Sequence, residues 1–155
     1  IMNLVDAGYI SYMDLVKQFR ENTRQLECHL GNINSADCCC SGINKTQCFL
    51  IVEIGRRPDI SVKELAEIVR IDKSGVSRLI EDLVKKEYVQ RKPAATDRRF
   101  VTLNLLPKGQ ERFEKIENDM YYKFKKVLEQ IPEDKRMQVV ESLKIYSDAC
   151  RKVEE

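Results

Sequence analysis

The segment SVKELAEIVRIDKSGVSRLIEDLVKKEYVQRKPAATDRRFVTLNL, residues 61–105, contains two hydrophobic periods in succession. Up to about residue 86 the apolar residues recur at intervals of three and four positions, which is the spacing of amphipathic helices. From residue 88 onwards apolar and polar residues alternate, which is typical of β-strands. The segment therefore predicts two short helices followed by a β-hairpin.

Capping residues mark the starts of the two helices. Ser61 is followed three positions later by Glu64, and this spacing predicts a capping box in which each side chain satisfies a backbone N–H. Asp72 suits the N-cap of the second helix, which is predicted over residues 73–86. Two short helices joined by such a tight turn are the core of a helix-turn-helix.

The second helix has an apolar face and a small polar face. Its predicted buried residues are Val76, Leu79, Ile80, Leu83 and Val84. Its opposite face presents Lys73, Ser74, Ser77 and Arg78, together with Glu81 or Asp82. Serine hydroxyls can donate to phosphates or base edges, and arginine can pair with the edge of a guanine. The same pattern also suits an ordinary solvated helix, so this face alone leaves both interpretations open.

The predicted hairpin adds a local concentration of positive charge. Between residues 85 and 99, six basic side chains stand against two acidic ones, a local charge of +4 in a chain whose net charge is +2. An arginine at a hairpin tip, here Arg98 or Arg99, fits a narrow and electronegative minor groove. The helix pair and the basic hairpin together indicate a winged helix-turn-helix that binds double-stranded DNA.

Long helices flank this region, so the predicted fold is mainly α with a small β-hairpin wing. The first helix carries a row at Val5, Tyr9, Tyr12, Val16, Phe19, Thr23, Leu26 and Leu30. The last helix carries a similar row at Val139, Leu143, Tyr146, Cys150 and Val153. Gly31 to Gly42 indicates a break, Asn44 or Ser41 suits a helix N-cap, and Pro107 suits a first helical turn. Terminal helices cannot bury such rows internally, so these must pack on helices of the same chain or of a partner.

Strand alternation also predicts the two faces of the second strand of the hairpin. Val101, Leu103 and Leu105 are predicted on one face, with Thr102 and Asn104 on the other face. Residues 93–97 are predicted to join the two strands.

Residues 62–116 resemble the winged-helix segment of the multiple-antibiotic-resistance regulator (MarR) family. The resemblance lies in ELA, SGVSRLIEDLVKKEYVQR, DRR and VTLNLLPKGQ, and it extends over roughly residues 44–131. It implies an obligate homodimer that binds pseudo-palindromic operators, usually as a repressor. It further implies a single intertwined domain per chain, in which residues 1–31 and 107–155 form the dimerisation region and residues 43–106 bind DNA.

The resemblance also implies roles for individual residues. With Lys73 added from the charge pattern, the predicted DNA-contacting set is Lys73, Ser74, Ser77, Arg78, Arg98 and Arg99. Asp97 would orient a wing arginine. Two departures from the family pattern are Gly75 inside the second helix, where glycine costs up to roughly 1 kcal/mol, and Glu87, where the family usually has glycine.

Six residues with metal-binding or redox chemistry lie within 21 positions of one another: Cys28, His29, Cys38, Cys39, Cys40 and Cys48. Their thiolates can bind a thiophilic metal or metalloid ion, although the spacing matches no zinc ribbon. An oxidant can convert a thiolate to a disulfide or a sulfenic acid. The cysteines can also pack as small apolar residues, and a regulator of this type then responds to a small organic ligand.

The neighbours of each cysteine favour different interpretations. Small polar residues surround the consecutive cysteines 38–40, which favours thiol sensing by an effector at that place. Cys48 and Cys150 lie on apolar helix faces, which favours packing.

Composition and motifs argue against other classes of protein. No apolar run is long enough to span a membrane, and the first residues lack the basic start and apolar block of a signal peptide. A cytoplasmic location is therefore expected. One histidine and the lack of any catalytic motif argue against an enzyme. A helical protein-interaction module with a solvated basic hairpin is the alternative to a DNA-binding regulator.

Overall fold

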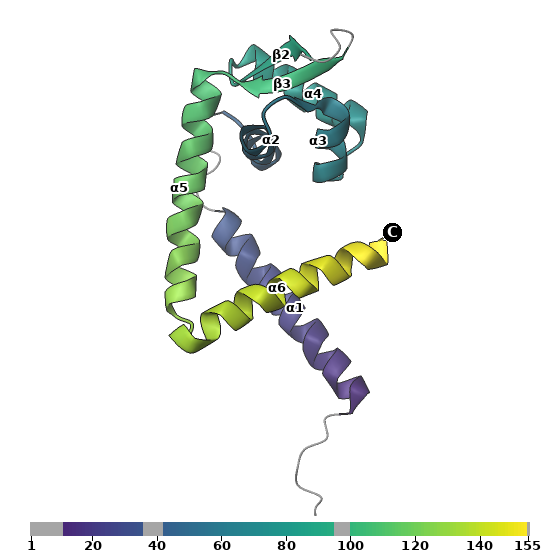
Figure 1. Cartoon of the computed structure of the whole chain (residues 1–155), viewed down its shortest axis with the longest axis vertical. Coiled ribbons are helices and arrows are strands. Elements are labelled where there is room, and N and C mark those ends of the chain that lie inside the picture. The colour runs from purple at the N-terminus through teal and green to yellow at the C-terminus, as the bar shows by residue number, and fades with distance from the viewer. Residues whose placement is uncertain (1–10, 36–41, 95–99, 155) are drawn as a thin grey trace, which may run out of the picture. The chain divides into compact units, whose positions relative to one another are not determined.

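The computed structural model describes residues 11–35, 42–94 and 100–154 (Figure 1). The helices are α1 (Tyr12–Ser35), α2 (Lys45–Arg56), α3 (Val62–Val69), α4 (Lys73–Lys85), α5 (Pro107–Glu129) and α6 (Glu133–Glu154). The strands are β1 (Ile60–Ser61), β2 (Val89–Pro93) and β3 (Val101–Leu105). The predicted fold class, mainly α with a small β wing, is confirmed. The chain divides into two compact units, residues 1–38 and residues 39–155.

The core of the second unit forms around α2. Figure 1 shows α2 end-on between α5 and α3, with the sheet beside it, and α2 contacts all of these elements. The fully buried side chains are Leu50, Ile51, Ile54, Leu65, Val76, Ile80, Leu83, Val89 and Leu103. The predicted inner face of α4 is therefore confirmed at three positions, while Leu79 and Val84 are half-buried.

Side-chain caps begin the short helices. The Asn44 side chain accepts from the Gln47 N–H, and the Gln47 side chain accepts in return from the Asn44 N–H. Ser61 and Glu64 form the same reciprocal pair at the start of α3, as predicted. Each box satisfies two N–H groups that have no partner within the helix, which fixes where the helix begins.

The sheet has three antiparallel strands in the order β1–β3–β2, so one strand escaped the prediction. Ile60 pairs with Leu103, and Pro93 pairs with Val101 at the far end of the hairpin. A two-residue strand is too short to show alternation in a sequence, which explains why β1 was missed. Pro93 thus belongs to β2 rather than to the predicted connection.

Residues on the same predicted face of the second hairpin strand differ in burial. Leu103 is fully buried, but Val101 is 46% exposed and Thr102 is only 8% exposed. Thr102 is covered because it pairs with Ser61 of β1, and its hydroxyl donates to Asp59 Oδ1. Val101 lies beyond the end of β1, so its side chain is not covered.

Helix α1 continues through the position where a break was predicted. Gly31 lies inside α1, which ends at Ser35, so Cys28 and His29 lie within the helix and not at its end. The side chains of both residues are exposed. A glycine in an exposed helix costs roughly 1 kcal/mol, which is too little to terminate a helix of 24 residues.

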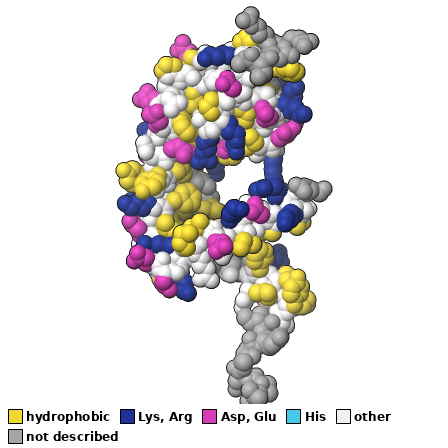
Figure 2. All heavy atoms as spheres, in the orientation of Figure 1, with side chains coloured by type: hydrophobic (Ala, Val, Ile, Leu, Met, Phe, Trp, Pro, Cys, Tyr) yellow, Lys and Arg dark blue, Asp and Glu magenta, His cyan; other side chains and the backbone are white. Residues whose placement is uncertain are grey.

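Helices α1 and α6 leave their apolar rows uncovered. No described side chain of either helix is buried. Figure 2 shows hydrophobic side chains exposed along α5, α6 and the start of α1. Cys150, which was predicted to be a core residue, is exposed on α6. None of the described helices is long and apolar enough to cross a membrane.

The link from α4 to β2 passes through a left-handed residue. Glu87 has φ 63°, and the N–H of Tyr88 donates to the Leu83 carbonyl at 2.9 Å, which closes the helix end. Residues with a Cβ are strained in this conformation. Glu87→Gly is therefore expected to raise the free energy of unfolding by about 1 kcal/mol, measured by urea denaturation.

A matched substitution tests whether the conformation at Glu87 is the cause. Glu81 is an exposed residue inside α4, where Glu81→Gly is expected to lower the free energy of unfolding by about 1 kcal/mol. If both glycine variants were destabilised equally, the left-handed strain at Glu87 would be contradicted.

Candidate nucleic-acid interface

The start of α4 is organised by Asp72. Its Oδ1 accepts from the Gly75 N–H at 2.9 Å and from the Ser74 hydroxyl at 2.6 Å. The hydroxyl of Ser74, followed by the backbone N–H of Gly75, lowers the pKa of the Asp72 carboxyl. The predicted N-cap is confirmed, and the Ser74 hydroxyl is oriented by the carboxylate with its oxygen left to accept a further bond.

Gly75 lets the capping carboxylate close over the helix. A Cβ at this position would lie 2.9 Å from Asp72 Oδ2 and 3.1 Å from Ile71 Cγ2. The glycine that departs from the family pattern therefore has a local reason, because a larger residue would crowd the cap.

The polar face of α4 points away from the core. Lys73, Ser74 and Arg78 are exposed, and Ser77 is half-buried. On the opposite side Val76 and Ile80 are fully buried. Because the apolar side is fixed in the core, the rotation of the helix about its axis is set, and the small polar face is presented to solvent.

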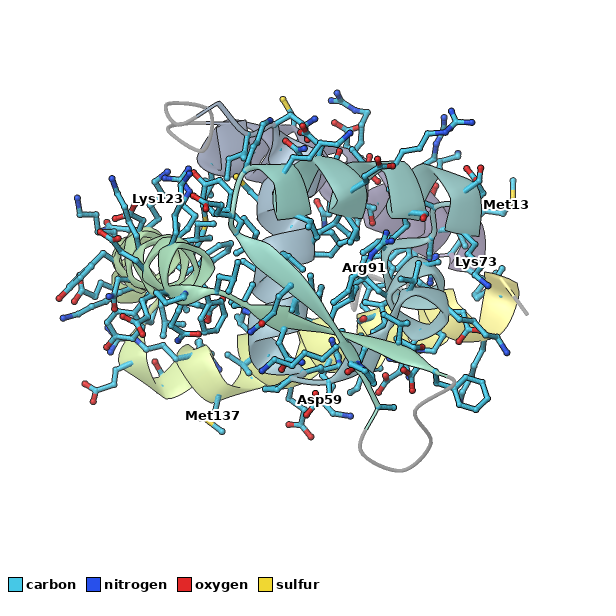
Figure 3. All side chains as sticks on the ribbon, turned by 90° about the horizontal axis from the view of Figure 1, so that it is seen from above. Met13, Asp59, Lys73, Arg91, Lys123 and Met137 are labelled. Carbon is cyan, nitrogen blue, oxygen red and sulfur yellow. The ribbon has the colours of Figure 1, made fainter. Side chains whose placement is uncertain are left out.

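The hairpin adds further exposed cations. Arg91 and Lys92 on β2 are exposed and stand opposite Leu103 and Thr102 of β3. Figure 3 looks down on the hairpin and shows the Arg91 and Lys73 side chains on the side where α3 and α4 lie. The predicted wing residues Arg98, Arg99 and Asp97 lie outside the described residues.

Asp59 anchors the wing, a role that sequence reasoning missed. Its Oδ1 accepts from Asn104 Nδ2 at 2.8 Å and from Thr102 Oγ1 at 3.3 Å, so it joins the turn before β1 to β3. Asp59 adopts φ 65°. The turn sequence RRPD was a signal for this conformation, but the partner residues are more than 40 positions away.

The cysteine residues are only partly described. Cys38, Cys39 and Cys40 lie outside the described residues, so thiol sensing by them stays a prediction. Cys28 lies with His29 in the first compact unit, while Cys48 is a buried residue of α2 in the second. The Cys48 thiol lies 4.0 Å from Arg112 Nη2. Among the described residues no group of three or more His, Cys, Asp or Glu side chains could hold a metal ion.

The family model that matches this chain covers the part that holds α2, α3, α4 and β2. Residues 41–99 match the model of the MarR family. The HTH-type transcriptional regulator BilQ of Clostridium symbiosum is 31% identical over 98 residues, which cover 63% of this chain and 68% of BilQ. This chain belongs to the MarR family. It is therefore a DNA-binding transcriptional regulator, in agreement with the sequence prediction.

Two further proteins are similar to this chain, one in sequence and one in structure. The HTH-type transcriptional repressor MdtR of Bacillus subtilis is 27% identical over 75 residues, and the match spans about half of each chain, 48% in both cases. The MarR-family fold is also seen in Streptococcus pneumoniae FabT, whose crystal structure was solved in complex with DNA. That structure has a TM-score of 0.73 and 16% identity, and the alignment covers 91% of this chain and 99% of FabT.

Proposed function

We propose that this MarR-family chain is a homodimeric repressor that binds a pseudo-palindromic operator and responds to an effector. The observation that carries the proposal is the polar face of α4, where Lys73, Ser74 and Arg78 are exposed opposite a fully buried apolar side. Such a helix can enter the major groove while its other side stays in the core. One similar protein, MdtR, is named a repressor, which supports that direction of control.

The arrangement supports different roles for α4 and for the wing in DNA binding. Arg78 and Ser77 are the residues proposed to reach base edges, because they lie one turn into α4. Lys73 is proposed to contact phosphate with its ammonium. The Asp72 carboxylate already occupies the Gly75 N–H, so this part of the helix start is closed to phosphate. Arg98 or Arg99 is proposed to enter the minor groove.

The uncovered apolar rows support dimerisation. Exposed apolar residues on α5 and α6 include Tyr121, Phe124, Val127, Val140 and Leu143. An exposed apolar surface of this extent marks an interaction site, and a second copy of the chain is the proposed partner. The proposed division is a dimerisation region over residues 1–31 and 107–155 around a DNA-binding region over residues 43–106.

Two kinds of effector are proposed as alternatives. In the first, Cys38, Cys39 and Cys40 respond to a thiophilic ion or to a mild oxidant. In the second, a small organic molecule is the effector and the cysteines only pack. The burial of Cys48 supports packing at that position. DNA affinity of the reduced protein with and without these agents, repeated after Cys→Ser changes at 38–40, separates the two.

Arg78→Ala tests the proposed recognition face. The variant is expected to lose about 1–3 kcal/mol of binding free energy for the operator and to relax preference at one base position. Fluorescence anisotropy with duplexes from the region upstream of the regulator's own gene measures both effects. Lys144→Ala removes a positive charge from α6, where Lys144 pairs with Asp148, and is expected to bind normally. Equal operator affinity of the Arg78 variant and the unmodified protein would contradict the assignment of Arg78 to the recognition face.

A further inference from the structure

Lys86 connects the end of α4 to the chain that precedes α2. Its Nζ donates to Asp82 Oδ2 at 2.7 Å and to the Gly42 carbonyl at 2.7 Å. The second bond joins residues that are 44 positions apart. The ammonium group is therefore engaged by two oxygens of the protein, although from sequence alone it counts among the basic residues near the wing.

Asp82 adds a second connection from the same place. Its Oδ2 also accepts from Gln47 Nε2 at 2.5 Å, and Gln47 is only 3% exposed. The oxygen of the same carboxamide accepts from the Asn44 N–H at 3.0 Å. The bond to Lys86, followed by the bond to Gln47, lowers the pKa of Asp82. Both polar ends of Gln47 are thus used, and α4 is attached to the capping box of α2.

Lys85 provides a built-in comparison. It neighbours Lys86 and carries the same charge, but its Nζ pairs with Glu81, one turn earlier on the same helix, at 3.1 Å. Both partners of that pair are well exposed. Within the part of the chain that the structure describes, the Lys85 pair makes no further connection that links α4 to another element. Lys86, in contrast, is also bonded to Gly42 before α2, and Asp82 to Gln47 of α2.

We propose that Asp82 and Lys86 are positioning residues for operator recognition, which hold α4 at a fixed orientation against the start of α2, and that Lys86 does not contact DNA. The proposal rests on the proposed function of α4. Lys86 lies eight positions after Arg78, a distance of about 12 Å along a helix. Because a helix is rigid, a small rotation at its end displaces the residues that read the bases at its start. Hydrogen bonds to base edges tolerate little displacement.

The test compares two duplexes across a range of salt concentrations. One is the duplex that the unmodified protein selects from a random-sequence pool, and the other is an unrelated duplex of equal length. Lys86→Met is expected to weaken binding to the selected duplex about tenfold. Its binding to the unrelated duplex and the salt dependence of binding are expected to stay unchanged, because no phosphate contact is lost. Lys85→Met is expected to behave as the unmodified protein.

Further variants separate positioning from loss of structure. Asp82→Asn removes the charge without changing the shape, and it is expected to lose the preference for the selected duplex as Lys86→Met does. Lys86→Arg keeps the charge and is expected to retain most of that preference. Circular dichroism measures the folded fraction of each variant. Titration with duplex at concentrations well above the dissociation constant measures the concentration of protein that is able to bind DNA. Destabilisation alone would leave the affinity of that folded fraction unchanged and would overturn the proposal.

Two other results would also overturn the proposal. One is a Lys86→Met variant whose salt slope falls by about 1 and whose binding to both duplexes weakens alike, because this marks a phosphate contact. The other is a variant that binds both duplexes normally. Failure of the proposed function would give a different result. The unmodified protein would select no duplex from the pool, or the Arg78→Ala variant would bind the selected duplex as tightly as the unmodified protein does.

Discussion

Gly109→Ala is expected to lower the free energy of unfolding by about 3 kcal/mol. A Cβ at this position would lie 2.0 Å from the carbonyl oxygen of Tyr88 and 3.0 Å from its carbonyl carbon. Both are backbone atoms, so no side chain can rotate away. The same carbonyl accepts the Leu106 N–H at 3.0 Å, and the Lys108 ammonium lies 4.5 Å from the centre of the Tyr88 ring. Moving Tyr88 to relieve the overlap would therefore break the attachment of α5 to the hairpin.

Urea denaturation measures this loss, and Gly31→Ala is its control. Gly31 is also a helical glycine, but a Cβ there meets nothing within 4 Å, so the variant is expected to gain up to roughly 1 kcal/mol. Changes in the free energy of unfolding with opposite signs for the two variants would identify the close approach of Tyr88 as the cause of the loss at Gly109. A Gly109→Ala variant as stable as the unmodified protein would show that this approach is not required.

Leu143→Asp is expected to convert the proposed dimer to monomers and to weaken operator binding by about a hundredfold or more. Leu143 belongs to the row at Val139, Leu143, Tyr146, Cys150 and Val153, and none of these side chains is buried within the chain. A carboxylate placed in an apolar interface must be desolvated without a partner, which opposes association. A monomer can hold only one half of a pseudo-palindromic site, so the affinity gained from two linked contacts is lost.

Sedimentation equilibrium and anisotropy measure the two effects on the same samples. Ser142→Asp places the same carboxylate one position earlier, outside the apolar row, and Ser142 is exposed. This control is expected to remain dimeric and to bind DNA normally. If the Leu143 variant stayed dimeric, the row on α6 would have no place in the interface.

The elements that could be predicted from the sequence are those whose determinants are local. The cap of α2 at Asn44, the capping box at Ser61 and the cap of α4 at Asp72 each act over three positions, and all three are confirmed. The change from helical to alternating periodicity located α4 and the hairpin for the same reason. The resemblance to the MarR family then supplied the overall fold, which the comparisons confirm.

The features that escaped prediction depend on distant partners. Strand β1 exists because Ile60 pairs with Leu103, and the Asp59 carboxylate meets Asn104 across 45 positions. The bond between Lys86 and Gly42 is of the same kind. Alternation within one strand cannot show where a neighbouring strand ends, so it did not predict that Val101 is exposed and Thr102 is buried.

The candidate site could be predicted only in part. Periodicity placed Lys73, Ser74 and Arg78 on one exposed face, because their opposite face is apolar. Asp72 was predicted as the cap of that helix, but the bond from the Ser74 hydroxyl to its carboxylate was not predicted. Cys150 was wrongly predicted to be buried, since an apolar row does not say whether its own chain or another covers it. The roles of the DNA-contacting residues and of the cysteines 38–40 stay predictions.

The close contact between Gly109 and Tyr88 has a mechanical consequence. With no side chain between them, the start of α5 and the base of the hairpin form one stiff joint. Helix α5 has 23 residues and is about 35 Å long, so it acts as a lever arm with the wing at one end. In the proposed dimer, the gap between the two wings would follow the tilt of this lever. The half-site spacing that the proposed dimer could match, about 34 Å in one turn of DNA, would then depend on a helix angle and not on the residues of the wing.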